Sequence, residues 1–153
     1  MKISRRMLLA LGLTLPTSGL KTKIFEQNAS AFTDGSTMKV ISTWPFGIPA
    51  NARAWELLQN GSTALDAVEQ GVKVTEADPE VTSVGYNGSL DRDGRLTLDA
   101  CIMDHRGMCG SVAGLEHIMH PISVARAIME RTPHVMLVGS GALDFAISQG
   151  FQK

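Results

Sequence analysis

The pattern of apolar and polar residues changes several times along this chain, and each change marks the end of one predicted element. Residues 38–43 form a short β-branched run that predicts a buried strand, which Pro45 ends. Residues 48–61 repeat their apolar positions at helical spacing, and a second helix is predicted after Thr63, so the two form a helical hairpin. The second helix is expected to have an apolar face with Leu65, Val68 and Val72, and beside it a small-residue face with Ala64, Ala67 and Gly71.

The rest of the chain predicts a glycine-rich loop, a β-hairpin, a helix, a short buried strand and a final helix. In chain order these are residues 79–94, 95–104 with 108–116, 120–133, 134–140 and 141–150. The first arm of the hairpin alternates, with Leu98, Ala100 and Ile102 on one face. This mixture of helices and strands favours a layered α/β fold.

Two cysteines lie on the predicted hairpin, with a histidine between them. A turn over 104–107 would pair Ile102 with Cys109 and Cys101 with Gly110, so the two thiols would point to opposite faces. That arrangement argues against both a disulfide and a shared metal. The spacing of Cys101, His105 and Cys109 is also not a strong zinc pattern. We therefore expect no metal site and two buried free thiols.

The amino terminus has the pattern of an export signal. A basic start with an arginine pair precedes an apolar run over 7–15 and then Pro16, and the run is too short to span a membrane. We expect residues 1–31 to be a signal peptide and leader, of either twin-arginine or general type, with an anchoring helix as the alternative. Residues 32–38 are then flexible and 39–153 form the folded part. The protein would be periplasmic or secreted, or lysosomal in a eukaryote.

Composition narrows the function classes further. The chain has 153 residues, 44% hydrophobic and 19% charged, which is typical of one globular domain. A net charge of −1 gives no electrostatic case for nucleic-acid binding. Aromatic residues are only 5%, yet Trp44 and Phe46 flank a proline at the end of a predicted strand. They either cover a core or form a ligand surface, and composition leaves both open.

No motif in the chain identifies a reaction by itself. The stretch Ser83–Ser89 resembles a phosphate-binding loop, but it lacks the lysine and is followed by a strand. The aspartate-rich stretch before Gly94 is not a calcium loop, because Ala100 stands where that loop needs a glutamate. What remains is a loop in which glycine and asparagine permit positive φ and close approach of the backbone.

Six segments in succession resemble the glycosylasparaginases. They are TWPFG, ALDAVEQGV, SVGYNGS, DRDGRLTLDACIMD, PISVARAIMERTPHVMLVG and ALDFAISQGF, and together they cover nearly all of 39–153. The resemblance implies the N-terminal-nucleophile hydrolase fold, a four-layer αββα sandwich. The chain resembles most of the α subunit, so an incomplete half of that fold is expected, truncated before the autocleavage site.

The resemblance also implies a reaction. Such enzymes cleave their own precursor before a threonine, and the freed N-terminal threonine attacks the amide that joins N-acetylglucosamine to asparagine, without a cofactor. This chain contains no Asp-Thr pair, so the nucleophile is expected beyond Lys153 and the 153-residue chain alone is expected to be inactive. The implied partners are a glycoasparagine substrate and the protein's own β subunit in an (αβ)2 assembly. A plant-type asparaginase or isoaspartyl peptidase, or a non-catalytic remnant, is the alternative.

Site residues follow from the matched motifs only. Trp44 matches the tryptophan at the substrate pocket of the family, and Phe46 matches its aromatic companion. Where the family usually has glycine this chain has Asn87, the next best residue for positive φ, so the loop shape is expected to survive. The loop near the active site comprises Ser83, Gly85, Asn87 and Gly88.

Overall fold

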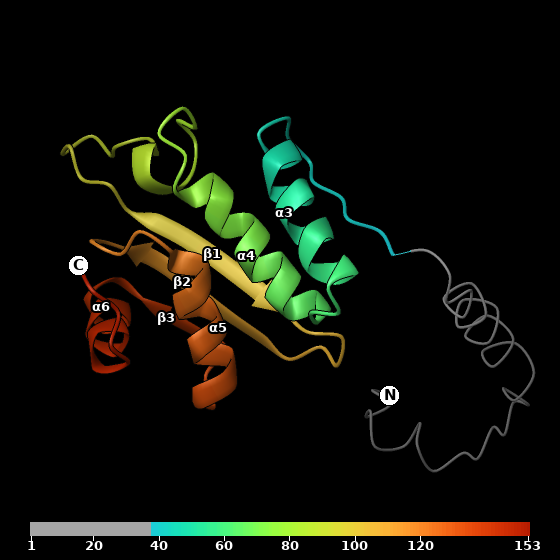
Figure 1. Ribbon diagram of the computed structural model, residues 1–153. Helices are drawn as coiled ribbons and strands as arrows, with labels where there is room; N and C mark the ends of the chain where they lie inside the picture. Colours follow the sequence, from blue (N-terminus) through green and yellow to red (C-terminus); the bar gives the residue numbers. More distant parts are fainter. Residues whose placement is uncertain (1–37) are drawn as a thin grey trace, which may run out of the picture. The chain divides into compact units, whose positions relative to one another are not determined.

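The computed structural model describes residues 38–153, of which Lys39–Lys153 form one compact unit (Figure 1). The predicted export signal over 1–31 lies outside the described residues. The elements in chain order are α3 (Gly47–Gln59), α4 (Ala64–Glu76), the 3-10 turn η1 (Gly85–Asn87), β1 (Leu98–Met103), β2 (Cys109–Leu115), α5 (Pro121–Arg131), β3 (Met136–Val138) and α6 (Gly139–Ser148). Within this part of the chain, no helix is long and apolar enough to cross a membrane.

The predicted helical hairpin is confirmed in α3 and α4. Thr63 caps α4, because its Oγ1 accepts a hydrogen bond from the backbone N–H of Asp66 at 3.1 Å. Both predicted faces of α4 make contacts: Leu65 and Val72 pack against the core, and the small residue Gly71 meets α3. Val68 is the exception, because its side chain is 49% exposed. A Cβ on Gly71 would lie 2.8 Å from the carbonyl oxygen of Ala50, so close contact between the helices excludes a larger residue there.

The three strands form one sheet in the order β1-β2-β3. β1 and β2 are antiparallel, as the hairpin prediction required, while β2 and β3 are parallel and are connected through α5. The register of the hairpin is one residue away from the prediction: Met103 pairs with Cys109, and Cys101 pairs with Ser111. A shift of one residue reverses the relative facing of side chains on the two strands, so both cysteines lie on the same face of the sheet.

The prediction of oppositely facing, buried thiols is therefore wrong. Cys101 is exposed, Cys109 is partly buried, and both are free. They are diagonal neighbours across the two strands, about 7–8 Å apart, which is too far for a disulfide without backbone movement. Among residues 38–153, no group of three or more His, Cys, Asp or Glu side chains is placed to hold a metal ion.

One face of the sheet carries the hydrophobic core. Helices α5 and α6 pack on this face, and the core residues are Ile102, Val112, Leu115, Ile118, Ile122, Val124, Ala125, Ile128, Met129, Ala142 and Ala146. On the opposite face Cys101, Met103, Met136 and Val138 are exposed. The prediction that β3 is buried is thus wrong, because β3 is an edge strand with one face uncovered.

The first predicted strand does not form. Residues 38–43 have no regular structure, and the side chain of Ile41 is 92% exposed. A β-branched run becomes a strand only where a neighbouring strand completes its ladder of hydrogen bonds. In the described part of the chain the sheet consists of β1, β2 and β3 alone, so this segment has no such neighbour.

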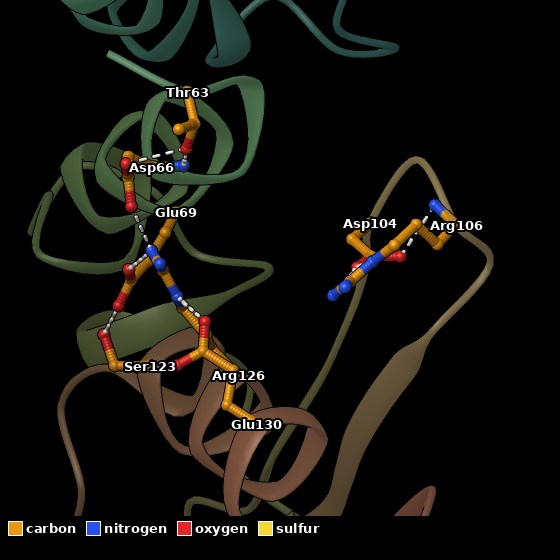
Figure 2. Close-up of polar contacts among 8 residues, drawn as sticks. All are labelled: Thr63, Asp66, Glu69, Asp104, Arg106, Ser123, Arg126 and Glu130. Carbon is orange, nitrogen blue, oxygen red and sulfur yellow. Dashed lines mark hydrogen bonds and ion pairs between the residues drawn. The ribbon is translucent and has the colours of Figure 1, made fainter.

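A network of charged side chains holds α4 against α5 (Figure 2). The Nη1 of Arg126 donates to Asp66 Oδ1 at 2.6 Å and to Glu69 Oε2 at 2.8 Å, and its Nε donates to Glu130 Oε1 at 2.8 Å. The hydroxyl of Thr63 and then the Arg126 guanidinium hold the pKa of Asp66 below its ordinary value. Because Arg126 lies on α5 and two of its partners lie on α4, the network sets the relative position of two helices that border the cavity described next.

Candidate functional site

A cavity of about 310 Å³ opens where the start of α3, the end of α4, the glycine-rich loop, β1 and the start of α5 meet. It brings together three of the six residues singled out from the sequence: Trp44, Phe46 and Gly85. Ser83, Asn87 and Gly88 are not among its lining residues. The remaining lining residues include Thr75, Glu76, Asp99 and Cys101, none of which the sequence assigned to a pocket.

A larger cavity, of about 600 Å³, lies elsewhere and is not the candidate site. It is lined by residues that include Arg95, His117 and Lys153, all exposed, and it contains none of the six residues singled out from the sequence. Functional pockets commonly combine aromatic walls with a few convergent polar groups and an ionisable group whose pKa is perturbed. The smaller cavity has all three features, so we take it as the candidate site.

The aromatic segment of the cavity is held by its backbone rather than by its rings. The carbonyl oxygen of Trp44 accepts from the N–H of Gly47 at 2.9 Å, which starts α3 immediately after the aromatic pair. The hydroxyl of Thr75 donates to the carbonyl oxygen of Phe46 at 3.4 Å. Phe46 is half-buried, but the side chain of Trp44 is 64% exposed. In this structure Trp44 does not cover a core, and its ring is free to meet a ligand.

The glycine-rich loop reaches the cavity through Val84 and Gly85. Gly85 has a φ of 67°, and a Cβ there would overlap the backbone of Glu76. Asn87 and Gly88 do not use the positive φ that their residue types permit: Asn87 is not in that region, and Gly88 has a φ of −61°. The side-chain amide of Asn87 instead donates to the carbonyl oxygen of Pro79 at 2.8 Å, which ties the loop to the end of α4.

Glu76, the last residue of α4, is the buried acid of the cavity. Its side chain is only 5% exposed; Oε1 accepts from the N–H of Ile122 at 3.0 Å, and Oε2 lies 3.1 Å from Nδ1 of His120. Burial raises the pKa of Glu76 to about 7, and the hydrogen bond from Ile122 opposes that rise. Burial also lowers the pKa of His120, and the nearby Lys73 acts in the same direction.

The sequence contains a signal for Glu76 in the spacing of its own helix. Glu76 follows Val68 and Val72 at intervals of four residues, so it is a carboxylate in line with the predicted apolar face of its helix. A charge in such a position needs a buried partner or a changed pKa. Its partners come from a segment more than 40 residues away, and only the fold brings them together.

Asp99 and Cys101 enter the cavity from β1. The Oδ1 of Asp99 accepts from the N–H of Gly114 at 2.7 Å, next to an irregularity in the pairing between Leu98 and Ala100. Asp99 thus fixes the local geometry of the hairpin at the cavity edge. Cys101 lies on the face of β1 opposite to the buried Ile102 and lines the same cavity.

Residues 42–153 match the family model described as asparaginase, and this range contains every element of the described fold. This chain belongs to the asparaginase family. The match begins at Ser42, the first residue of the cavity lining. The whole candidate site therefore lies within the part that the family shares.

Individual relatives of this asparaginase-family chain have three different names. It is 66% identical over 114 residues to the N(4)-(beta-N-acetylglucosaminyl)-L-asparaginase of Elizabethkingia miricola, covering 74% of this chain and 34% of that protein. It is 44% identical over 99 residues to the isoaspartyl peptidase of Salmonella typhimurium (64% and 31%). It is 47% identical over 100 residues to the plant-type L-asparaginase of Pyrococcus horikoshii (65% and 32%). The chain spans about a third of the length of each of these relatives.

The raised pKa of Glu76 predicts a stability that depends on pH. The folded state favours the neutral carboxyl, so its contribution is complete below the ordinary pKa of 4.5 and is lost as pH rises through about 7. A difference of this size corresponds to about 3 kcal/mol. We expect the free energy of unfolding of the wild type to fall by about that amount relative to Glu76→Gln between pH 4.5 and pH 8.

Urea denaturation of both proteins at pH 4.5, 6 and 8 measures this difference. Glu80→Gln removes the same charge at an exposed position and is the matched control. Its stability is expected to stay parallel to that of the wild type across the three pH values. Parallel behaviour of Glu76→Gln as well would contradict the prediction.

Proposed function

We propose that residues 42–153 form the N-terminal part of an amidohydrolase that cleaves the bond between N-acetylglucosamine and asparagine in glycoasparagines. The observation that carries the proposal is the candidate cavity, in which Trp44, Phe46 and Gly85 come together from separate segments. That cavity lies in a chain that is 66% identical to a protein named for this reaction. An exposed tryptophan beside a buried acid suits a ligand with both an apolar ring face and polar groups.

In the proposed enzyme the nucleophile and the pocket walls come from different parts of the protein. The nucleophile is an N-terminal threonine, freed by autoproteolysis, on a β subunit that pairs with this α-subunit part in an (αβ)2 assembly, and no cofactor takes part. The described residues supply walls and positioning: Trp44 and Phe46 form an aromatic wall, and Gly85 of the glycine-rich loop lines the same cavity. Export to the periplasm or out of the cell belongs to the same proposal.

We further propose that the α-subunit part and the β subunit together form an αββα sandwich. Its support is the uncovered face of the sheet, on which Met103, Met136 and Val138 are exposed while the opposite face is packed by helices. Large exposed apolar surfaces commonly mark places where another element packs. A second sheet from the β subunit, laid on this face, would complete the four layers.

A chimera tests the proposed reaction. Residues 42–153 replace the matched segment of the Elizabethkingia miricola protein, and aspartate release is measured with a glycoasparagine, L-asparagine and a β-aspartyl dipeptide. We expect the highest kcat/KM with the glycoasparagine. A higher kcat/KM with either other substrate would favour the asparaginase or isoaspartyl peptidase alternative. A folded chimera inactive on all three substrates would favour a non-catalytic remnant.

Trp44→Ala in the same chimera tests the aromatic wall. Removing a large ring from a ligand contact costs about 2 kcal/mol, so we expect kcat/KM for the glycoasparagine to fall about 30-fold. Trp55→Ala is the matched control, because Trp55 is also a partly exposed tryptophan but lies outside the cavity lining. Equal losses in the two variants would show that Trp44 acts through general packing.

A further inference from the structure

The end of α4 touches three segments that border the candidate cavity. The hydroxyl of Thr75 donates to the carbonyl oxygen of Phe46, in the aromatic segment. The backbone of Glu76 packs against Gly85 so closely that a Cβ there would overlap it. The carboxyl of Glu76 accepts from the N–H of Ile122 in the first turn of α5, and it also lies against His120. Two adjacent residues thus join the aromatic segment, the glycine-rich loop and α5.

We propose that Glu76 is a positioning residue of the candidate site: its buried carboxyl holds the start of α5 against the end of α4 and thereby sets where the Trp44–Phe46 segment and Gly85 stand around the cavity. The N-terminus of a helix has unpaired backbone N–H groups, and a carboxylate is their preferred partner. Here that partner comes from another helix, so the contact joins two elements rather than capping one.

Ionisable groups surround Glu76 on each element that packs near it. On its own helix, Lys73 and Glu69 affect its charge with opposite signs. His120 stands directly before α5, and Asp99 and Cys101 of β1 line the same cavity. Burial raises the pKa of Glu76 to about 7, so its carboxyl changes protonation close to neutral pH. The hydrogen bond from Ile122 is stronger to the charged carboxylate, so the contact should tighten as pH rises.

This inference rests on the proposed function only in taking the cavity as a substrate pocket. The measurements that test it need no turnover, so an inactive protein leaves them readable. A positive result with an inactive chimera would refute the proposed reaction and keep the positioning role. An active chimera without the pH-dependent steps would support the proposed reaction and overturn the positioning role.

The test uses the full 153-residue chain labelled with ¹⁵N. The amide of Ile122 reports the hydrogen bond, and acrylamide quenching of Trp44, in a Trp55→Phe background, reports the aromatic wall. As pH rises through about 7, we expect the Ile122 amide proton to move downfield and the quenching constant of Trp44 to change with the same midpoint. Coincident midpoints mean that one proton controls both the hydrogen bond at Ile122 and the exposure of Trp44.

Two variants identify the proton. In Glu76→Gln both steps are expected to disappear, whereas in His120→Asn both should remain. Steps that survive Glu76→Gln, or that vanish in His120→Asn, would assign the proton to another group and overturn the proposal. An Ile122 step without a Trp44 step would also overturn it, because Glu76 would then not position the aromatic wall. If Glu76→Gln does not fold, the wild type and His120→Asn still test the proposal. Coincident midpoints that persist in His120→Asn would support it, and separate midpoints or steps that vanish in His120→Asn would overturn it.

Discussion

Gly110→Ala is expected to lower the free energy of unfolding by about 4 kcal/mol or more, which would leave little or no cooperative unfolding transition. Gly110 lies in β2 where α5 crosses the sheet. A Cβ there would overlap the carbonyl oxygen of Ala125 and lie 2.6 Å from the backbone nitrogen of Met129. Both atoms belong to the helix backbone, so no side-chain rotation relieves the overlap. The helix would have to move off the sheet and expose the core.

Urea denaturation followed by circular dichroism measures this loss. Gly141→Ala is the matched control, because nothing lies within 4 Å of a Cβ built on Gly141, inside α6. Alanine is the better helix former, so the control is expected to gain up to about 1 kcal/mol. A Gly110→Ala protein as stable as the wild type would contradict the observed distance between β2 and α5.

Gly85→Ala is expected to cost a similar amount and to disrupt the candidate site as well. Gly85 has a φ of 67°, where an alanine is strained by roughly 1–2 kcal/mol. In addition, the Cβ would overlap the backbone of Glu76, and the loop would have to leave the end of α4. We expect a total loss of about 4 kcal/mol and the loss of the Ile122 amide step that reports Glu76.

Gly94→Ala separates the backbone strain at positive φ from the overlap with Glu76. Gly94 has a φ of 77°, yet nothing lies within 4 Å of a Cβ built on it. It should therefore show only the backbone strain of roughly 1–2 kcal/mol, with the Ile122 signal unchanged. Equal losses of stability in Gly94→Ala and Gly85→Ala would mean that strain alone matters and that the contact with Glu76 does not.

Local patterns predicted most of the elements because they depend on near neighbours in sequence. The apolar spacing around Ala50 and Ala54, the cap at Thr63 and the stop at Gly61 are all local, and α3 and α4 form as expected. The alternation that ends at Ile102 likewise placed β1 and its buried face. The predicted strand over 38–43 failed because a strand depends on a neighbour, which no local pattern can supply.

Long-range contacts decided the details of the candidate site. The motif resemblance pointed to Trp44 and Phe46, but only the fold places them in one cavity with Gly85. The hairpin register differs by one residue from the prediction and places Cys109 on the same face of the sheet as Cys101, which lines that cavity. Register depends on the packing of the whole sheet face, and the turn residues alone did not reveal it.

By itself, then, the sequence determined the helices, the hairpin and the family, since these depend on local spacing and on motifs in order. The tertiary structure alone decided that Glu76 is a buried acid. Its partners, Ile122 and His120, lie more than 40 residues away, and the pKa of a carboxyl depends on how much water and which donors surround it. Those surroundings exist only once α4 and α5 have packed together.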